Sequence, residues 1–241
     1  MNPPRISADD ALFLDLDGTL VGIAPTPDAV RPASHLLELL DSASRHVGSA
    51  LAIVSGRPIR QIDSMLAPLA LPAAGLHGLE RRSAGGAYTP PPALPRFNEL
   101  RAALGRFAAD RPGLLLEDKS AALALHYRAR PELEAEAIAA VEAVLGGKRG
   151  GIAVQHGKAV IELRPEGADK GAAVAAFMSE PPFAGRRPVF TGDDITDEAA
   201  FRAVRQRGGV TVRVGVEGAT AAEWRLADVT AVHAWLADLE G

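Results

Sequence analysis

The sequence predicts an α/β protein with a doubly wound parallel core and a smaller inserted α+β unit. Two observations predict the core. Short apolar runs typical of buried strands alternate with amphipathic helical stretches, and this alternation occurs in both the first and the last part of the chain. A third observation predicts the insert, because the middle of the chain changes to two successive helix–strand–strand units. The core is therefore expected to be discontinuous in sequence.

The core elements are predicted in order, each from its own pattern. The first strand is expected at 11–16, and a helix with apolar residues on one side follows between Ser34 and Gly48. A second strand at 51–54 precedes a helix that begins near Pro58, since proline is tolerated in a first helical turn. The last part of the chain repeats the alternation, with helices at 170–178, 195–204 and 231–239 and strands at 188–191 and 210–214.

Loop-forming residues separate the insert from the core. Gly85–Gly86 and the proline run at 90–92 indicate a hinge, and a second hinge is expected near 164–167. Between the hinges the pattern predicts helices at 97–109 and 131–145 and strands at 113–118, 122–128, 152–155 and 158–163. The expected domains are a core at residues 1–82 and 165–241 and an α+β insert at residues 83–164.

Composition narrows the class of protein. The 241 residues, 47% of them hydrophobic, suffice for one large domain or a core with a modest insert, and they exclude wholesale disorder. The formal net charge of −4 gives no general attraction to nucleic acid or an anionic membrane, and the absence of cysteine excludes disulfides and cysteine nucleophiles. Residues 1–5 lack the apolar run of a signal peptide, and no apolar run approaches the about 18 residues of a membrane span. We therefore expect a cytoplasmic protein.

Two aspartates follow the first expected strand. Asp15 and Asp17 lie at its carboxyl end, where ligands bind in open α/β sheets, and Gly18 allows the backbone to turn sharply. An aspartate in such a place can attack phosphorus and form an aspartyl-phosphate. A second acid can protonate the departing oxygen and later deprotonate a water molecule. The alternative interpretation is a β-hairpin, because Asp-Gly between alternating apolar residues is also a hairpin turn.

Three further segments point to phosphate and metal binding. Ser55 and the backbone N–H groups after it suit a phosphate, although a plain Ser-Gly turn has the same pattern. Lys170 opens a helix, where the helix dipole disfavours a cation, so it either neutralises a phosphate and a carboxylate or is simply solvated. The run from Asp193 to Glu198 contains four carboxylates, more than a helix cap requires, and hard oxygen ligands of this kind suit Mg²⁺.

Together these segments resemble the haloacid dehalogenase superfamily of phosphatases, which combines a Rossmann-like core with an inserted cap. The resemblance rests on DLDGT at 15–19, Ser55, Lys170 and GDD at 192–194, in that order. It implies that Asp15 is the nucleophile, that Asp17 is the acid/base, and that Lys170 and Ser55 hold the phosphoryl group. It also implies a Mg²⁺ cofactor, whose site would consist of Asp15, Asp17, Asp193, Asp194 and Asp197.

A narrower resemblance covers nearly the whole chain, from about residue 12 to residue 200. The segments SGRP at 55–58, GLHG at 75–78, LEDKS at 116–120 and IELRP at 161–165 are similar to those of the trehalose-6-phosphate phosphatase family. This resemblance implies hydrolysis of trehalose 6-phosphate to trehalose and phosphate through an aspartyl-phosphate, as a step of trehalose biosynthesis. The substrate-binding residues expected from it are Ser55, Gly56, Arg57, His77, Gly78, Glu117, Lys119 and Glu162.

Other interpretations of the same residues stay open at this point. A phosphatase of another sugar or glycosyl phosphate would share the core chemistry and differ in the insert. A phospho-accepting regulatory module would need neither Asp17 nor a large insert, and a pure sugar-binding protein would not need Asp15, Lys170 and Asp193 together. We expect a monomer whose partner is a small-molecule sugar phosphate, without nucleic acid or membrane.

The insert itself supports a sugar site only in part. Glu117 and Lys119 share one face of an expected strand because side chains alternate along a strand, and Glu162 lies on another strand of the insert. Charged groups make strong hydrogen bonds to sugar hydroxyls. The same pattern would also suit a solvated antiparallel face that carries cross-strand ion pairs.

Overall fold

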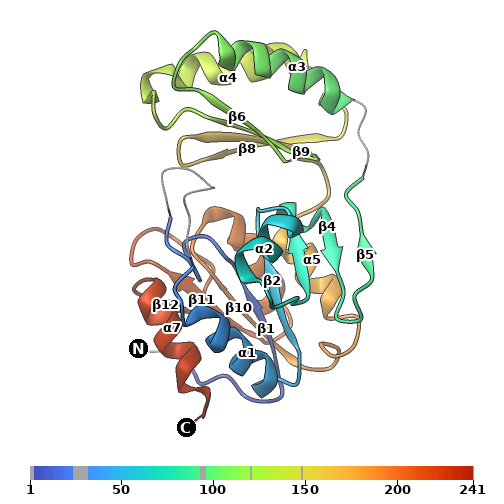
Figure 1. The fold of residues 1–241 in the computed structure, drawn as a ribbon, viewed down its shortest axis with the longest axis vertical. Helices are drawn as coiled ribbons and strands as arrows, with labels where there is room; N and C mark the ends of the chain where they lie inside the picture. Colours follow the sequence, from blue (N-terminus) through green and yellow to red (C-terminus); the bar gives the residue numbers. More distant parts are fainter. Residues whose placement is uncertain (1–2, 24–31, 93–95, 120, 148, 241) are drawn as a thin grey trace. The chain divides into compact units, whose positions relative to one another are not determined.

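The computed structural model describes residues 3–23, 32–92, 96–119, 121–147 and 149–240, which form two compact units (Figure 1). The core unit consists of Met1–Pro90 and Ala168–Gly241, and the insert unit consists of Pro91–Gly167. The first junction lies later than the expected boundary at residue 83. The reason is that Tyr88–Thr89 forms a short strand, which pairs with Glu80–Arg82 in the core sheet.

The core unit is built on an eight-stranded sheet with the order β12-β11-β10-β1-β2-β3-β4-β5. Its strands are β1 (Asp10–Leu14), β2 (Leu51–Val54), β3 (Ala73–Gly75), β4 (Glu80–Arg82), β5 (Tyr88–Thr89), β10 (Arg187–Gly192), β11 (Val210–Val214) and β12 (Trp224–Leu226). Neighbours from β12 to β3 run parallel, and only β4 and β5 pair antiparallel. The predicted doubly wound parallel core is confirmed. The hairpin interpretation of Asp15–Gly18 is wrong, because β1 pairs in parallel with β10 and β2.

The central strand β1 is buried along its whole length. Its side chains alternate between the two faces of the sheet, so Leu12 and Leu14 point to one face and Phe13 to the other. Phe13 packs against Phe183 and Phe177, with ring centroids 5.4 and 6.0 Å apart. Burial of an apolar side chain of this size contributes about 2–3 kcal/mol. Asp15, which follows the last residue of β1, is therefore attached to a tightly packed strand.

Helices cover the core sheet and connect its parallel strands. They are α1 (Leu36–His46), α2 (Ile59–Leu66), α5 (Lys170–Phe177), α6 (Glu198–Arg205) and α7 (Val229–Ala237), with short 3₁₀ turns η2 (Leu76–Gly78), η4 (Ile195–Asp197) and η5 (Asp238–Glu240). Helix α1 packs against α7, and α5 packs against α6. In Figure 1, α1 and α7 lie in front of the sheet and α5 lies behind it. No helix in the described part of the chain is long and apolar enough to cross a membrane.

The insert unit is an α+β structure, as the sequence predicts. Its antiparallel sheet has the order β6-β7-β9-β8, formed by β6 (Leu115–Asp118), β7 (Leu123–His126), β9 (Val160–Pro165) and β8 (Ile152–Gly157). The helices α3 (Arg96–Ala109) and α4 (Glu134–Leu145) cover one face, and η3 (Pro131–Leu133) precedes α4. Leu104 and Val141 from the helices and Leu125 and Ile161 from the strands belong to one buried cluster. The opposite face of this sheet carries the polar residues described below.

Four short strands of the core were not predicted, namely β3, β4, β5 and β12. Each has only two or three residues, too few to show an alternation of apolar and polar positions. The residues of β3, Ala73-Ala74-Gly75, also have low β-propensity. These strands form because neighbouring strands offer hydrogen-bonding partners, which is a tertiary effect.

Candidate active site

Asp15 lies immediately after β1, at the carboxyl edge of the core sheet, and is 4% exposed. Its backbone N–H donates to the carbonyl of Thr191 at 2.9 Å, which continues the pairing between β1 and β10. Its Oδ1 accepts from Lys170 Nζ at 2.6 Å, and its Oδ2 lies 3.4 Å from the hydroxyl of Thr19, which donates. The carboxylate is thus held by the strand before it, the turn after it and a lysine far away in sequence.

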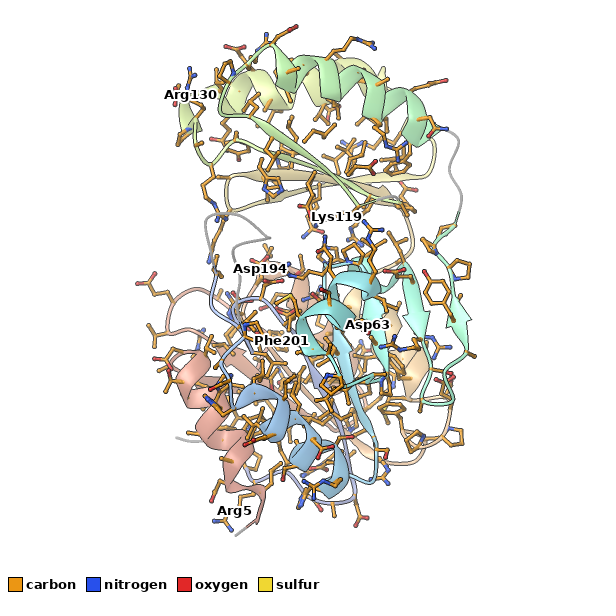
Figure 2. The ribbon with its side chains drawn as sticks, in the orientation of Figure 1. Arg5, Asp63, Lys119, Arg130, Asp194 and Phe201 are labelled. Atoms are coloured by element: carbon orange, nitrogen blue, oxygen red, sulfur yellow. The ribbon has the colours of Figure 1, made fainter. Side chains whose placement is uncertain are left out.

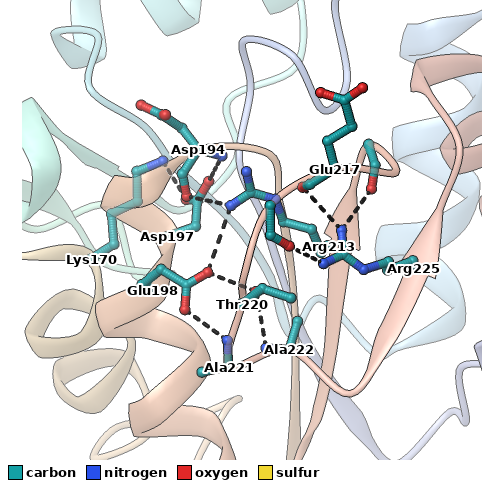
Figure 3. Close-up of polar contacts among 12 residues, drawn as sticks. Lys170, Asp194, Asp197, Glu198, Arg213, Glu217, Thr220, Ala221, Ala222 and Arg225 are labelled. Atoms are coloured by element: carbon teal, nitrogen blue, oxygen red, sulfur yellow. Dashed lines mark hydrogen bonds and ion pairs between the residues drawn. The ribbon is translucent and has the colours of Figure 1, made fainter. Parts of the chain in front are cut away.

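Lys170 is the first residue of α5 and joins two carboxylates. Its Nζ donates to Asp15 Oδ1 and to Asp197 Oδ1, both at 2.6 Å. The other oxygen of Asp197 accepts from the backbone N–H of Asp194 at 2.8 Å (Figure 3). Lys170 is only 2% exposed, so the interpretation of it as a solvated lysine is wrong.

Asp193 completes a cluster of carboxylates with Asp15 and Asp197. One oxygen of each lies within 4.8 Å of the others. Gly18 permits this arrangement, because its φ is +78° and a Cβ there would lie 2.2 Å from Asp193 Oδ2. Hard carboxylate oxygens at this spacing fit Mg²⁺. Both oxygens of Asp15 and both oxygens of Asp197 accept hydrogen bonds, so a cation at this cluster would share these oxygens with Lys170, Thr19 and the N–H of Asp194.

Burial and like charge govern the electrostatics of this cluster. Burial raises the pKa of Asp15 well above its ordinary value, although Lys170 opposes this effect. The carboxylates of Asp197 and Asp193 raise the same pKa further. Burial alone would lower the pKa of Lys170, but the charges of Asp15 and Asp197 outweigh it, and that pKa is raised. A divalent cation would offset the like charges and favour an ionised Asp15.

Asp17 and Arg57 form a bidentate ion pair at the same edge of the core sheet. Arg57 Nε donates to Asp17 Oδ2 at 2.6 Å, and a second guanidinium nitrogen donates to Oδ1 at 2.7 Å. Arg57 N–H donates to the buried hydroxyl of Ser55 at 3.1 Å. In this structure Arg57, expected to bind substrate, therefore contacts the expected acid/base.

The residues 55–57 and 77–78, which were expected to bind substrate, lie together in one cluster of loops. The N–H of His77 donates to the carbonyl of Ser55 at 2.9 Å. The His77 ring lies against the backbone of Gly56, where a Cβ would be 2.7 Å from Nε2. Gly78 follows in the turn η2 with a φ of +102°.

Arg213, which was not expected from the sequence, supports the acidic loop after β10 together with Glu198, one of the four expected carboxylates. A guanidinium nitrogen of Arg213, near the end of β11, donates to the carbonyl of Asp194 at 3.1 Å and lies 3.6 Å from Glu198 (Figure 3). Glu198 accepts from the hydroxyl of Thr220 at 2.6 Å and from the N–H of Ala221 at 2.8 Å. The position of Arg213 close to the carboxyl end of an expected strand was the available signal, the same one that identified Asp15.

Glu117, Lys119 and Glu162 belong to the insert unit. Lys119 Nζ donates to Glu162 Oε1 at 2.6 Å, and His126 Nε2 lies 3.0 Å from Glu117 Oε2. Figure 2 labels Lys119 on the sheet face opposite α3 and α4. Burial raises the pKa of Glu117, but His126 and Lys119 outweigh burial, so the pKa lies below its ordinary value. The ion pair of Lys119 with Glu162, a contact of the kind that the alternative interpretation predicts, is present. Ser120, the last residue of the LEDKS segment, lies outside the described residues.

The discontinuous parallel core with its α+β insert is the fold found in haloacid dehalogenase-like hydrolases. A solved haloacid dehalogenase-like hydrolase from Bacteroides thetaiotaomicron has the same fold, with a TM-score of 0.66 and 17% identity over 95% of this chain and 97% of its own. The family model described as trehalose-phosphatase matches residues 13–230. The chain belongs to the trehalose-phosphatase family, a family of phosphoric monoester hydrolases.

Individual relatives agree with this assignment. A probable trehalose-phosphate phosphatase of Sinorhizobium fredii is 47% identical over 85% of this chain and 77% of its own length. The trehalose-6-phosphate phosphatase of Escherichia coli is 43% identical over 97% of this chain and 87% of its own. The C-terminal domain of C. albicans trehalose-6-phosphate phosphatase has the same fold, with a TM-score of 0.83 and 22% identity over 98% of this chain and 97% of its own.

Proposed function

We propose that this protein is a Mg²⁺-dependent phosphatase that hydrolyses trehalose 6-phosphate to trehalose and phosphate through a phospho-Asp15 intermediate. The observation that carries the proposal is the Asp15 carboxylate at the end of β1, with Lys170 on one oxygen and Asp193 beside it. The substrate is proposed from the names of the relatives with 43% and 47% identity. The product places the reaction in trehalose biosynthesis.

The first step is attack of an Asp15 oxygen on the phosphorus of the substrate. The new bond joins Asp15 to phosphorus, and the ester bond to the sugar oxygen breaks with its electron pair on that oxygen. In this step Asp17 carries a proton on one oxygen, which gives up its contact with Arg57, and donates that proton to the leaving oxygen, so the sugar leaves as an alcohol. Lys170 and Ser55 bind the phosphoryl oxygens, which keeps phosphorus in line with the attacking carboxylate.

The second step is hydrolysis of the phospho-Asp15 intermediate. Asp17, now deprotonated, accepts a proton from a water molecule, and the water oxygen attacks phosphorus. The bond between phosphorus and the Asp15 oxygen breaks, which releases phosphate and restores the carboxylate. Arg57 holds both oxygens of Asp17 in the structure, which supports a fixed orientation for this acid/base.

Mg²⁺ would be held by Asp15 and Asp193, with the Asp17 backbone carbonyl, and Asp194 and Asp197 would orient this set. The bound ion would supply charge that screens the substrate phosphate from the surrounding carboxylates. The fit of the residues to a hard cation rests on the three carboxylate oxygens within 4.8 Å and on Gly18, which leaves Asp193 room to approach.

Substrate selection is proposed to reside in the insert unit, which would act as the cap domain. Glu117, Lys119 and Glu162 would accept from or donate to sugar hydroxyls, as charged groups do strongly. In the core, His77, Gly78 and Gly56 would line the phosphate side of the site together with Arg57. The ion pair of Lys119 with Glu162 supports a preformed polar face on the insert sheet.

A phosphate-release assay over a panel of sugar phosphates, with and without Mg²⁺, tests the proposal. Trehalose 6-phosphate is expected to be hydrolysed at least about tenfold faster than glucose 6-phosphate, sucrose 6-phosphate and other hexose phosphates, and EDTA is expected to abolish the activity. A faster reaction with another sugar phosphate would overturn the proposed substrate and would not contradict the proposed reaction steps. Full activity in metal-free buffer would contradict the Mg²⁺ requirement.

A further inference from the structure

The segment from the last residue of β3 to the first residue of β4, residues 75–80, packs directly against the turn that carries Ser55 and Arg57. We call these six residues, Gly75-Leu76-His77-Gly78-Leu79-Glu80, the clamp loop. Leu76, His77 and Gly78 have consecutive positive φ angles of 52°, 58° and 102°. Residues other than glycine rarely adopt this left-handed backbone, and each such residue costs of order 1–3 kcal/mol. The surrounding contacts must therefore impose this conformation.

Backbone hydrogen bonds tie the clamp loop to the Ser55 turn. Leu76 N–H donates to the carbonyl of Arg57 at 3.1 Å, and His77 N–H donates to the carbonyl of Ser55 at 2.9 Å. The segments touch without spare room, since a Cβ on Gly75 would lie 2.8 Å from the Arg57 carbonyl. The left-handed residues are thus the ones that direct consecutive N–H groups onto the turn.

The clamp loop also reaches the segment before Lys170. A Cβ on Gly78 would lie 2.9 Å from the carbonyl oxygen of Asp169 and 3.1 Å from Ala173 Cβ. Asp169 caps α5, because its side chain accepts from the N–H of Ala172. The clamp loop therefore contacts both the Ser55 turn and the start of the helix that carries Lys170.

Glu80, the last residue of the clamp loop, extends its side chain to the far end of the same turn. Glu80 is 6% exposed, and its Oε1 accepts from the N–H of Ile59 at 2.6 Å. Gly75 leaves the space for this carboxylate, because a Cβ there would lie 2.6 Å from Oε1. Ile59 begins α2, whose preceding residue Pro58 makes no side-chain cap. Glu80 thus supplies, from a neighbouring strand, the acceptor that the start of this helix lacks.

The second oxygen of Glu80 accepts a hydrogen bond from the edge strand β5. Tyr88 in β5 donates its hydroxyl to Glu80 Oε2 at 2.5 Å. This hydrogen bond raises the pKa of Tyr88 to about 12. The carboxylate is therefore fixed at both oxygens, one by the turn and one by the edge strand.

We propose that Glu80 is a positioning residue, which orients Arg57 and through it the carboxylate of Asp17. Glu80 acts on Arg57 through the backbone. It accepts from the N–H of Ile59, which lies two residues after Arg57, and Pro58 between them has a restricted φ. The guanidinium of Arg57 then holds both Asp17 oxygens at 2.6 and 2.7 Å. The inference rests on the proposed function, in which Asp17 protonates the leaving oxygen.

The test compares two small substrates that differ in leaving group and carry no sugar. Phenolate in phenyl phosphate is a poorer leaving group than nitrophenolate in p-nitrophenyl phosphate, so only the former depends strongly on a proton from Asp17. Glu80→Ala is expected to lower kcat for phenyl phosphate about 10²-fold, the scale of a small misplacement of a catalytic group, with KM changed less than about threefold. The kcat for p-nitrophenyl phosphate is expected to fall less than about tenfold.

Conservative and control variants separate positioning from general loss of structure. Glu80→Gln keeps an acceptor for Ile59 and is expected to restore most of the phenyl phosphate activity. Glu180→Ala is the matched control, because Glu180 accepts from Arg81, the residue after Glu80, at 2.6 Å. It is expected to retain the wild-type ratio of the two activities. An equal fall of both activities in Glu80→Ala, or wild-type activity on both, would overturn the proposal.

A second measurement asks whether Glu80 acts through Asp17. In an Asp17→Asn background, Glu80→Ala is expected to cost less than about threefold, because the group that it orients has already lost its function. The same cost in both backgrounds would overturn the proposal. If Glu80→Ala does not fold, Glu80→Asp takes its place, since the shorter chain cannot reach both Ile59 and Tyr88. Activity in Asp15→Asn would contradict the proposed function itself, whereas failure of these Glu80 tests alone leaves it intact.

Discussion

The polar cluster of the core unit and the polar face of the insert unit are built in opposite ways. In the core, Asp15, Lys170 and Asp197 come from segments far apart in sequence, are nearly inaccessible to solvent, and lie beside Asp193. In the insert, Lys119 pairs with Glu162 across the sheet, where both side chains keep some exposure. The core cluster therefore places three carboxylates close together, whereas on the insert face a lysine pairs with a carboxylate of opposite charge.

This difference shows what each cluster alone can reveal about function. Like charges that are buried together raise the pKa of Asp15 and oppose folding, so a structural role does not account for them. The Lys119–Glu162 pair is largely buried, so the cost of removing both charges from water offsets much of their attraction, and a pair of this kind does not by itself indicate a ligand. The core cluster therefore points to chemistry by its own geometry. The sugar-binding role that we propose for Lys119 and Glu162 rests on the resemblance to the trehalose-phosphatase family.

The largest expected effect is that of the nucleophile. Asp15→Asn should lower the rate of phosphate release from trehalose 6-phosphate at least about 10³-fold, because the amide keeps the shape but cannot attack phosphorus. The free energy of unfolding should stay equal or rise, since one of several buried carboxylates becomes neutral. Phosphate release and chemical denaturation measure the two quantities. Asp9→Asn, on the exposed amino side of β1, is the matched control and should behave as wild type.

The second effect concerns Mg²⁺, which we expect to bind at the carboxylate cluster of the core unit and not at the polar face of the insert. Asp193→Asn should raise the Mg²⁺ concentration that gives half-maximal activity at least about 10²-fold, because a ligand to the cation is lost. Mg²⁺ should raise the thermal midpoint of the wild-type protein and leave that of the variant nearly unchanged. Melting curves with and without Mg²⁺ give this result independently of activity. An identical Mg²⁺ response in both proteins would remove Asp193 from the proposed site.

The third effect tests the insert face. Lys119→Ala should lower kcat/KM for trehalose 6-phosphate about 10²-fold, equivalent to about 3 kcal/mol, while hydrolysis of p-nitrophenyl phosphate hardly changes. The reason is that an aryl phosphate has no sugar hydroxyls to bind. The matched control is Arg101→Ala, which breaks the ion pair of Arg101 with Asp118 at 2.6 Å, a pair formed between helix α3 and strand β6. An equal loss in both variants, or none in either, would make the Lys119 pair a purely structural contact.

The smallest effect uses the two tyrosines, one in each unit. The hydrogen bond to Glu80 raises the pKa of Tyr88 to about 12, and burial with a bond to Glu134 raises that of Tyr127 to about 12. A tyrosine whose pKa is raised in the folded state stabilises the protein at pH values below its ordinary pKa of about 10. This stabilisation is lost as the pH rises through the folded pKa of about 12. Phenolate absorbance of the folded protein should therefore stay low up to about pH 11.

Single substitutions of the two partners sharpen this comparison. Glu80→Gln in the core and Glu134→Gln in the insert should each release one phenol to ionise closer to pH 10, because the acceptor charge is gone. The amplitude of the early transition should be about half of the total in each variant, as the chain contains two tyrosines. A wild-type transition near pH 10 for both phenols would contradict the hydrogen bonds of Tyr88 to Glu80 and of Tyr127 to Glu134.

The fold was predictable where elements are long enough to carry a pattern. The strand expected at 51–54 and the strand expected at 210–214 have the predicted bounds in β2 and β11. The short strand β5 was not predictable, because two residues such as Tyr88–Thr89 show no periodicity. For that reason the expected boundary at residue 83 separated Tyr88 from the core sheet to which it pairs.

The candidate site was predictable residue by residue where strand ends gather polar side chains. Asp15, Ser55 and Asp193 all follow core strands and meet at one edge of the sheet, as parallel strands require. Glu80 and Arg213 were missed for different reasons. Glu80 begins an unpredicted strand, whereas Arg213 lies near the carboxyl end of a predicted strand, a position whose signal was available and was not used.

The sequence by itself determined the alternation of strands and helices, and with it the edge at which Asp15, Ser55 and the acids after β10 would lie. These features depend on local periodicity and on the fixed geometry of parallel strands. Only the tertiary structure decided which charges meet: Arg57 with Asp17, Lys170 with both Asp15 and Asp197, and Glu80 with the start of α2. Such pairings depend on register, side-chain direction and available space, which are set by packing between residues distant in the chain.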